Sequence, residues 1–333
     1  MPKLLNRIII LLSLTVLAGC GSTDLPVVTQ IPFASASPLQ MMGGAPEEGE
    51  ELANFASTGA ECGIDEREVA TMVYLPRAGR LGDGVIGCSI IRPPSRVRDK
   101  ALHRQLWALS KALIPDDDEN RIERVVLAQD RRSETLAFVA TLDDEGRAWE
   151  FGLNLDAVNL DDQDIYEELL STIIHEYAHI LSLNDTQVSY STEQQAAYDD
   201  FSISDESYEQ ITLKAAKQCL ALAGIYDGDA CYRPDSHMYM FFQTFWESYG
   251  DDSLAAAAAG AIYDENPGDF VNDYAGTSPT EDFAETFAAW LMPDHSAFEI
   301  TDAVRAKFEF FEGRIGLTTA RDQIAKGLRS VRN

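Results

Sequence analysis

Positive charge is scarce in this chain: 26 Lys and Arg residues stand against 55 Asp and Glu residues, so the formal net charge is -29 over 333 residues. This excess of negative charge repels nucleic-acid phosphates and anionic lipid surfaces, which excludes a nucleic-acid-binding protein. No apolar run reaches the roughly 20 residues that a membrane-spanning helix needs. The acidic stretches do not follow the twelve-residue EF-hand pattern, so we expect no calcium loop.

The N-terminus has the order of a bacterial lipoprotein signal peptide. Two basic residues precede a short apolar stretch over 8–16, and the motif Leu-Ala-Gly-Cys ends at Cys20. The apolar stretch is too short for an uncleaved anchor helix. We therefore expect residues 1–19 to be removed and Cys20 to carry a lipid in the bacterial cell envelope. Gly21, in place of an Asp, favours the outer membrane by analogy with lipoprotein sorting, on its periplasmic or its exposed side.

The next segment, residues 20–60, is rich in Ser, Pro, Gly and Glu. Such a composition cannot bury enough apolar surface to fold, which predicts a disordered tether. From about residue 61 the chain becomes apolar and periodic, and residues 61–333 suit one large domain. Within this domain, residues 186–270 are expected to form a mostly helical spacer.

Cysteine is also rare. Apart from Cys20, the chain contains only Cys62, Cys88, Cys219 and Cys231. An even number in an exported protein indicates disulfides, and proximity along the chain favours Cys62–Cys88 and Cys219–Cys231. Free thiols and a separate metal site are the alternatives, although no C-x-x-C spacing occurs.

Only five histidines are present, and two of them belong to the segment His175-Glu176-Tyr177-Ala178-His179. Apolar residues at helical spacing, with Asp162 or Asp164 as a cap, predict that this segment lies inside a long buried helix. Two imidazoles one turn apart on one face form a zinc-binding geometry, and the Glu between them can serve as a general base. A metal ion is the simplest partner for such buried polar groups. We expect surface or core positions for the isolated His103, His237 and His295.

A catalytic zinc site needs a third protein ligand in addition to His175 and His179. Asp185 lies six residues after the second histidine, where some zincins have their third ligand. That arrangement usually needs a Gly to turn the chain out of the helix, and this sequence has Ser182 there. Asp185 is therefore the weaker of two candidates.

The stronger candidate lies in a second predicted helix, which begins at Pro279 after Ser278. Glu281 and Glu285 are four residues apart and share one side of this helix. A capping box between Ser278 and Glu281 would explain the stretch without any chemistry. With the upstream histidines, however, Glu281 suits a third zinc ligand and Glu285 suits a carboxylate that orients a histidine N–H.

Together with H-E-x-x-H, the pattern Y-x6-E-x-F-A-E-x-F from Tyr274 to Phe287 resembles the gluzincin metallopeptidases related to anthrax lethal factor. The resemblance implies that Glu281 binds zinc, that Glu176 is the general base and that Tyr274 stabilises the transition state. It covers two short blocks within residues 150–300. The spacer between them, about a hundred residues, is longer than in the family. This difference affects what the resemblance implies about the substrate-binding surface more than what it implies about the metal site.

The pattern before the H-E-x-x-H helix predicts a helix over 99–114 and strands over 122–129, 135–141 and 147–155. By the resemblance, this order implies an α+β, zincin-like metallopeptidase fold with a small mixed sheet, an active-site helix and a mostly helical lower lobe. The segment Trp149–Leu155 would then be the edge strand that pairs with an extended peptide.

The sequence thus predicts a zinc-dependent endopeptidase. Zinc would polarise the scissile carbonyl and its bound water, Glu176 would take the water's proton, and Tyr274 would donate a hydrogen bond to the oxyanion. A protein or peptide would be the substrate, and the lipid on Cys20 would bind the membrane. Two alternatives stay open: a zinc amidase acting on peptidoglycan cross-links, and a catalytically silent lipoprotein that binds an envelope partner. A silent binding module would have no need of the base Glu176.

Overall fold

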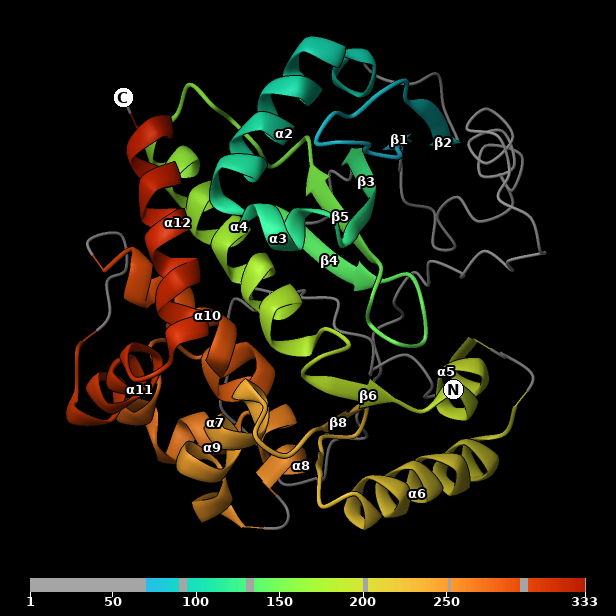
Figure 1. The fold of residues 1–333 in the computed structure, drawn as a ribbon, viewed down its shortest axis with the longest axis vertical. Helices are drawn as coiled ribbons and strands as arrows, with labels where there is room; N and C mark the ends of the chain where they lie inside the picture. Colours follow the sequence, from blue (N-terminus) through green and yellow to red (C-terminus); the bar gives the residue numbers. More distant parts are fainter. Residues whose placement is uncertain are drawn as a thin grey trace, which may run out of the picture.

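The computed structural model describes residues 70–89, 95–129, 135–199, 203–250, 253–293 and 299–332. Within them, five strands form a mixed sheet in the order β2-β1-β3-β5-β4 (Figure 1). The strands are β1 (Ala70–Tyr74), β2 (Val85–Ser89), β3 (Ile122–Gln129), β4 (Ala137–Thr141) and β5 (Trp149–Asn154). β3 and β5 are parallel, and the other neighbouring pairs are antiparallel. The predicted α+β class is confirmed, as are the three strands expected before the H-E-x-x-H helix.

The edge of the sheet next to β5 is formed by β4. Leu153 of β5 pairs with Leu127 of β3 on one side and with Ala137 of β4 on the other. The prediction that Trp149–Leu155 forms the edge strand is therefore wrong. All residues of β5 are buried, as expected for a strand with neighbours on both sides.

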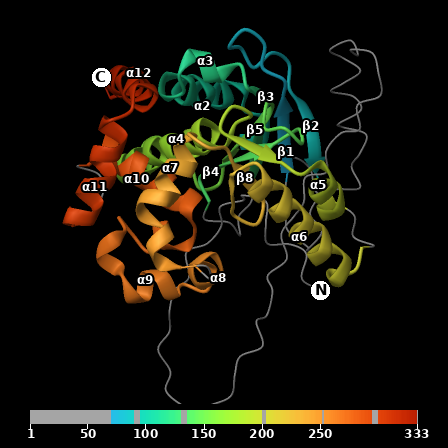
Figure 2. The ribbon, with the colours of Figure 1, turned by 60° about the horizontal axis from the view of Figure 1, so that its bottom comes forward.

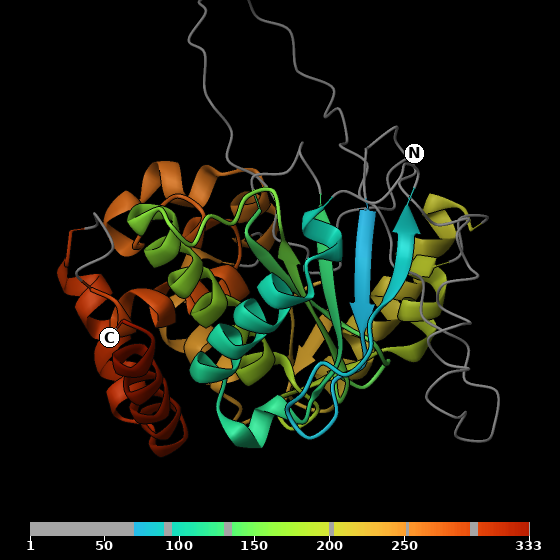
Figure 3. The same cartoon turned by 90° about the horizontal axis from the view of Figure 1, so that it is seen from above.

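Helices α2 (Lys100–Leu113) and α4 (Gln163–Leu183) lie on one side of the sheet, as the view from above shows (Figure 3). Asp99 begins α2, because its carboxylate accepts hydrogen bonds from the first free N–H groups of the helix. Trp107 of α2 packs on the sheet, with its ring centroid 6.4 Å from that of Phe151 in β5. The short helices η2 (Arg96–Arg98) and α3 (Asp116–Glu119) flank α2.

The C-terminal helix α12 (Ile315–Val331) packs against α2 (Figure 1). Gly327 marks the closest approach to α2, because a Cβ there would lie 1.6 Å from the carbonyl oxygen of Ala112. Tyr166 of α4 donates a hydrogen bond of 2.8 Å to the carbonyl oxygen of Val331. The end of the chain is thus joined to the helices that cover the sheet.

The lower left part of the molecule in Figure 1 consists of helices, and Figure 2 shows α7, α8 and α9 grouped together. Phe241 of α7 packs against Phe283 of α10 and Phe311 of α11, at centroid distances of 5.3 and 6.1 Å. This aromatic core holds the helices together. The elements are α7 (His237–Phe245), η3 (Glu247–Tyr249), α8 (Ser253–Ala258), α9 (Ala261–Glu265), η4 (Pro267–Asp269), η5 (Ala275–Thr277), α10 (Pro279–Leu291) and α11 (Asp302–Glu312).

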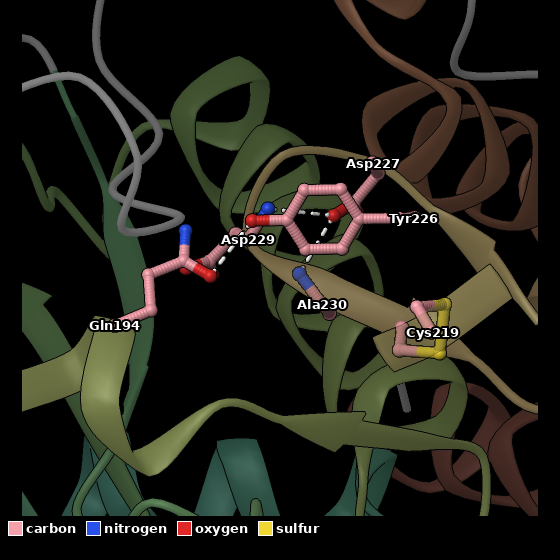
Figure 4. The surroundings of a disulfide bond; sticks show 7 residues. Gln194, Cys219, Tyr226, Asp227, Asp229 and Ala230 are labelled. Carbon is pink, nitrogen blue, oxygen red and sulfur yellow. Dashed lines mark hydrogen bonds between the residues drawn. A yellow bond between two sulfur atoms is a disulfide. The ribbon is translucent and has the colours of Figure 1, made fainter. Parts of the chain in front are cut away.

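The spacer expected to be mostly helical also contains a small sheet, ordered β6-β8-β7. The predicted disulfide Cys219–Cys231 joins the last turn of α6 to β8 (Figure 4). Nearby, Asp227 accepts hydrogen bonds from the Ala230 N–H and the Tyr232 hydroxyl, which close the turn between β7 and β8. These strands are too short for a periodic signal. The elements are β6 (Val188–Tyr190), α5 (Thr192–Asp199), α6 (Asp205–Ala221), β7 (Ile225–Tyr226) and β8 (Ala230–Tyr232).

Several predictions fall outside the part of the chain that the structure describes. They are the signal peptide over 1–19, the lipidation of Cys20, the tether over 20–60, the pairing of the Cys62 and Cys88 side chains, and His295. None of the described helices combines the length and the apolar character that crossing a bilayer requires.

Candidate metal centre

α4 carries both histidines of the H-E-x-x-H segment through the interior, between β4 and the lower helices (Figure 1). Asp162 begins the helix, and its carboxylate accepts hydrogen bonds from the next free N–H groups. His175 is 4 % exposed, and Glu176 and His179 are fully buried. Three polar side chains are therefore held in an apolar helix, where each needs a partner.

α10 lies beside α4 and brings two carboxylates to the histidines. Ser278 accepts a hydrogen bond of 3.1 Å from the Glu281 N–H, and Pro279 is the first helical residue, so the helix starts where the sequence predicts. The carboxylate of Glu281 points toward His175 and His179 instead of completing a capping box. Ser278 therefore caps α10, while the Glu281 side chain is left available to contact the histidines.

His175, His179 and Glu281 form a triangle of candidate ligand atoms. The two Nε2 atoms are 3.0 Å apart, and Glu281 Oε2 lies 3.3 Å from that of His175 and 3.4 Å from that of His179. Three ligand atoms on a tetrahedral ion with bonds of about 2.05 Å lie about 3.3 Å apart. Glu281 Oε2 is buried and has no hydrogen-bond partner, as a ligand atom would require. This group, the one of its kind among the described residues, can hold a metal ion.

Glu285 lies one turn after Glu281 and contacts the far side of an imidazole. Its Oε1 is 2.8 Å from His175 Nδ1. An acceptor at Nδ1 favours the tautomer in which Nε2 keeps its lone pair for a metal. The other carboxylate oxygen of Glu285 accepts a hydrogen bond of 2.7 Å from Asn272 Nδ2. Glu285 therefore joins His175 to the segment before α10.

Glu176 is buried beside the triangle, and neither of its carboxylate oxygens has a hydrogen-bond partner of ordinary geometry. Burial, with the charges of Glu281 and Glu285 and against the opposing charge of His175, raises the pKa of this carboxyl from 4.5 to about 8. A carboxyl whose pKa lies near neutrality can both take up and release a proton during a reaction.

Tyr274 lies at the start of η5, with its ring centroid 6.1 Å from that of His175. Burial raises the pKa of its phenol well above the ordinary value, and the charges of Glu281 and Glu176 add to this effect. The hydroxyl therefore stays protonated near neutral pH. It can serve as a hydrogen-bond donor beside the triangle.

The two histidines differ in their affinity for protons. Burial lowers the pKa of His175, but the charge of Glu285 and the carboxylate contacts of Glu281 and Glu285 outweigh burial and leave this pKa well above its usual range. Burial lowers the pKa of His179 below its usual range. Burial raises the pKa of Glu281, but the histidines outweigh it and hold this pKa at about 2.

The other candidates from the sequence lie outside this group. Asp185 forms an ion pair with Arg121, with 2.6 Å between Oδ1 and NH1. Both ring nitrogens of the buried His103 are hydrogen-bonded to neighbouring groups. His237 is half-buried at the first position of α7 and is not among the residues of the ligand group. Of the two candidates for a third ligand, the structure therefore brings Glu281 to the histidines.

Comparison with known proteins finds no match: no family model fits the chain, and neither a curated protein nor a solved structure is detectably similar to it. The resemblance to gluzincins therefore depends on the two motifs and on the geometry of the residues that they bring together.

Two supporting residues give little signal in the sequence. Asn272 has no pattern around it that marks it as a partner of Glu285. Lys307 of α11 forms a buried ion pair with Asp282, the residue after Glu281, with 2.6 Å between Nζ and Oδ2. It shares a helix face with Val304 and other apolar residues, and a lone Lys on an apolar face is the one available hint of a buried partner.

Proposed function

We propose that this chain is a zinc-dependent endopeptidase of the gluzincin type with a zincin-like fold, anchored in the cell envelope through Cys20. The observation that carries the proposal is the triangle of His175, His179 and Glu281 beside the buried Glu176. Two imidazoles and one carboxylate form the donor set of known catalytic zinc sites, which keep one position open for water or substrate. Hard cations such as calcium and magnesium prefer oxygen ligands alone.

The chain's own residues have the properties that peptide hydrolysis needs. A bound zinc would polarise the scissile carbonyl and lower the pKa of water. The positive charge of a cation would also lower the pKa of Glu176, so its carboxylate would be ionised and could take a proton from the attacking water. Tyr274 would donate a hydrogen bond to the developing oxyanion, and Glu285 would hold the His175 ring in place.

The sheet supports a peptide substrate. Within the described residues, β4 pairs with β5 alone, and it lies beside α4. The backbone N–H of Val139, in β4, is one of the groups that act on the pKa of Glu176, which supports placing the free edge of β4 next to the site. An extended peptide could add to this edge as a further strand. The role that the sequence suggested for Trp149–Leu155 therefore passes to Ala137–Thr141.

The first test combines metal content with hydrolysis, on the soluble protein that starts after Cys20. We expect about one zinc per chain by elemental mass spectrometry, a loss of zinc in Glu281→Ala and no loss in the control Asp185→Ala. We expect wild type to cleave members of a peptide library and Glu176→Gln to keep its zinc without cleaving them.

Each other result has its own meaning. No zinc in wild type would refute the metal site. Zinc without hydrolysis, with Glu176→Gln behaving identically, would instead indicate a silent binding module. Preference for cross-linked peptidoglycan over peptides would indicate an amidase.

A further inference from the structure

Asn272 uses both ends of its side-chain amide. Its Oδ1 accepts a hydrogen bond of 2.8 Å from the backbone N–H of Ala275, and its Nδ2 donates one of 2.7 Å to Glu285 Oε2. The first bond closes the turn that contains Tyr274. The second continues through Glu285 to Nδ1 of His175, 2.8 Å from Glu285 Oε1. One side chain thus joins the turn of the tyrosine to a candidate metal ligand.

These two partners determine the orientation of the Asn272 amide. Its oxygen must face an N–H group, and its nitrogen must face a carboxylate. A flipped amide would place N–H against N–H and a lone pair against the charge of Glu285. An Asp at this position could keep the bond to the Ala275 N–H, but it would place a second carboxylate against Glu285. The site therefore requires an amide specifically.

The hydrogen bond from Asn272 matters because the Glu285 carboxylate could otherwise turn toward solvent. Its side chain is 24 % exposed, so without a donor on its outer oxygen it can rotate toward water. The Nδ1 atoms of both histidines are buried without a hydrogen bond of ordinary geometry, and Glu285 Oε1 lies 2.8 Å from the one on His175. A carboxylate that is itself hydrogen-bonded orients a ligand better than a free one.

We propose that Asn272 is a positioning residue for the metal centre: it holds Glu285 against His175 and couples this contact to the turn that carries Tyr274. This inference rests on the metal site of the proposed function. It extends the ligand-supporting shell by one residue that contacts neither the metal ligands nor the attacking water.

The test uses a pair of substitutions that breaks the contact and then restores it with reversed polarity. Asn272→Asp keeps the bond to the turn and opposes two carboxylates. Glu285→Gln opposes two N–H donors. The double variant Asn272→Asp/Glu285→Gln again pairs a donor with a carboxylate, while the Gln oxygen can still accept from His175. Asn159→Asp is the matched control, because exposed Asn159 likewise caps a turn, through the Asp161 N–H, and is not one of the residues of the ligand group.

The main readout is zinc affinity, measured by competition with a chromophoric chelator, with the visible spectrum of the cobalt-substituted protein as a report on ligand geometry. We expect Asn272→Asp to weaken zinc binding by about tenfold or more and to change the cobalt spectrum. The double variant should bind zinc more tightly than Asn272→Asp alone. Asn159→Asp should match wild type, and the metal-free Asn272→Asp protein should melt close to wild type because its turn is still capped.

Unchanged zinc affinity in Asn272→Asp would overturn the inference, as would losses that simply add in the double variant. These outcomes differ from a failure of the proposed function. If wild type binds zinc and the affinities follow the expected pattern but no peptide is cleaved, Asn272 keeps its assigned role and the peptidase proposal fails. If wild type binds no metal, both are refuted.

Discussion

The buried carboxyl of Glu176 makes the stability of the metal-free protein depend on pH. Its pKa rises from 4.5 to about 8 on folding, mainly because of burial, so the folded state binds this proton more tightly than the unfolded state does. The stabilising effect of the bound proton is complete below the unfolded pKa and is lost as pH rises toward the folded one. Each pKa unit corresponds to about 1.4 kcal/mol, so the loss between pH 5 and pH 8 is at most about 4 kcal/mol.

Glu176→Gln carries no titrating group and should lack this loss. We expect the free energy of unfolding of the variant, relative to wild type, to increase between pH 5 and pH 8 by up to about 4 kcal/mol. Urea unfolding after treatment with a chelator, at both pH values, measures this difference. The control Glu168→Gln, at an exposed position of the same helix, should follow wild type at both. A constant difference between Glu176→Gln and wild type would show that Glu176 is already ionised at pH 5, and the reasoning from burial would be wrong.

Two further predictions concern a buried ion pair and the disulfide. Lys307→Met leaves Asp282 as a buried charge without its cation, and we expect the free energy of unfolding in urea to fall by about 3–5 kcal/mol. The control Lys326→Met, at an exposed position, should cost little. Equal stability of the two variants would contradict the importance of the ion pair. Cys219→Ser opens a loop of sequence separation 12 and should cost about 3 kcal/mol in oxidising buffer, a difference that a reductant should abolish. Equal stability in oxidising buffer would argue against this disulfide.

Much of the fold could be predicted wherever the signal is local. The 3.6-residue periodicity around the H-E-x-x-H segment and a cap at Asp162 or Asp164 predict α4, whose cap is Asp162 in the structure. Ser278 with Pro279 predicts the start of α10. The strand over 122–129 matches β3 from end to end. Hydrophobic periodicity and capping depend on neighbours in the chain, so they can be seen without the tertiary structure.

The order of strands in the sheet could not be predicted in this way. The segment Trp149–Leu155 has the composition of a strand, and nothing in its own residues tells an edge position from a central one. That difference depends on which strands pair across the sheet. The small sheet of β6, β7 and β8 was missed because strands of two or three residues have no measurable period.

The sequence by itself determined which functional groups are available to the site and which helices carry them. These groups are two imidazoles one turn apart with a Glu between them, and two carboxylates four residues apart. Only the tertiary structure decided that Glu281, rather than Asp185, meets His175 and His179. The physical reason is distance along the chain. A helix places residues four apart from local geometry alone, whereas the approach of α10 to α4 depends on packing across the whole interior. The same packing brings Asn272 and Glu285 together.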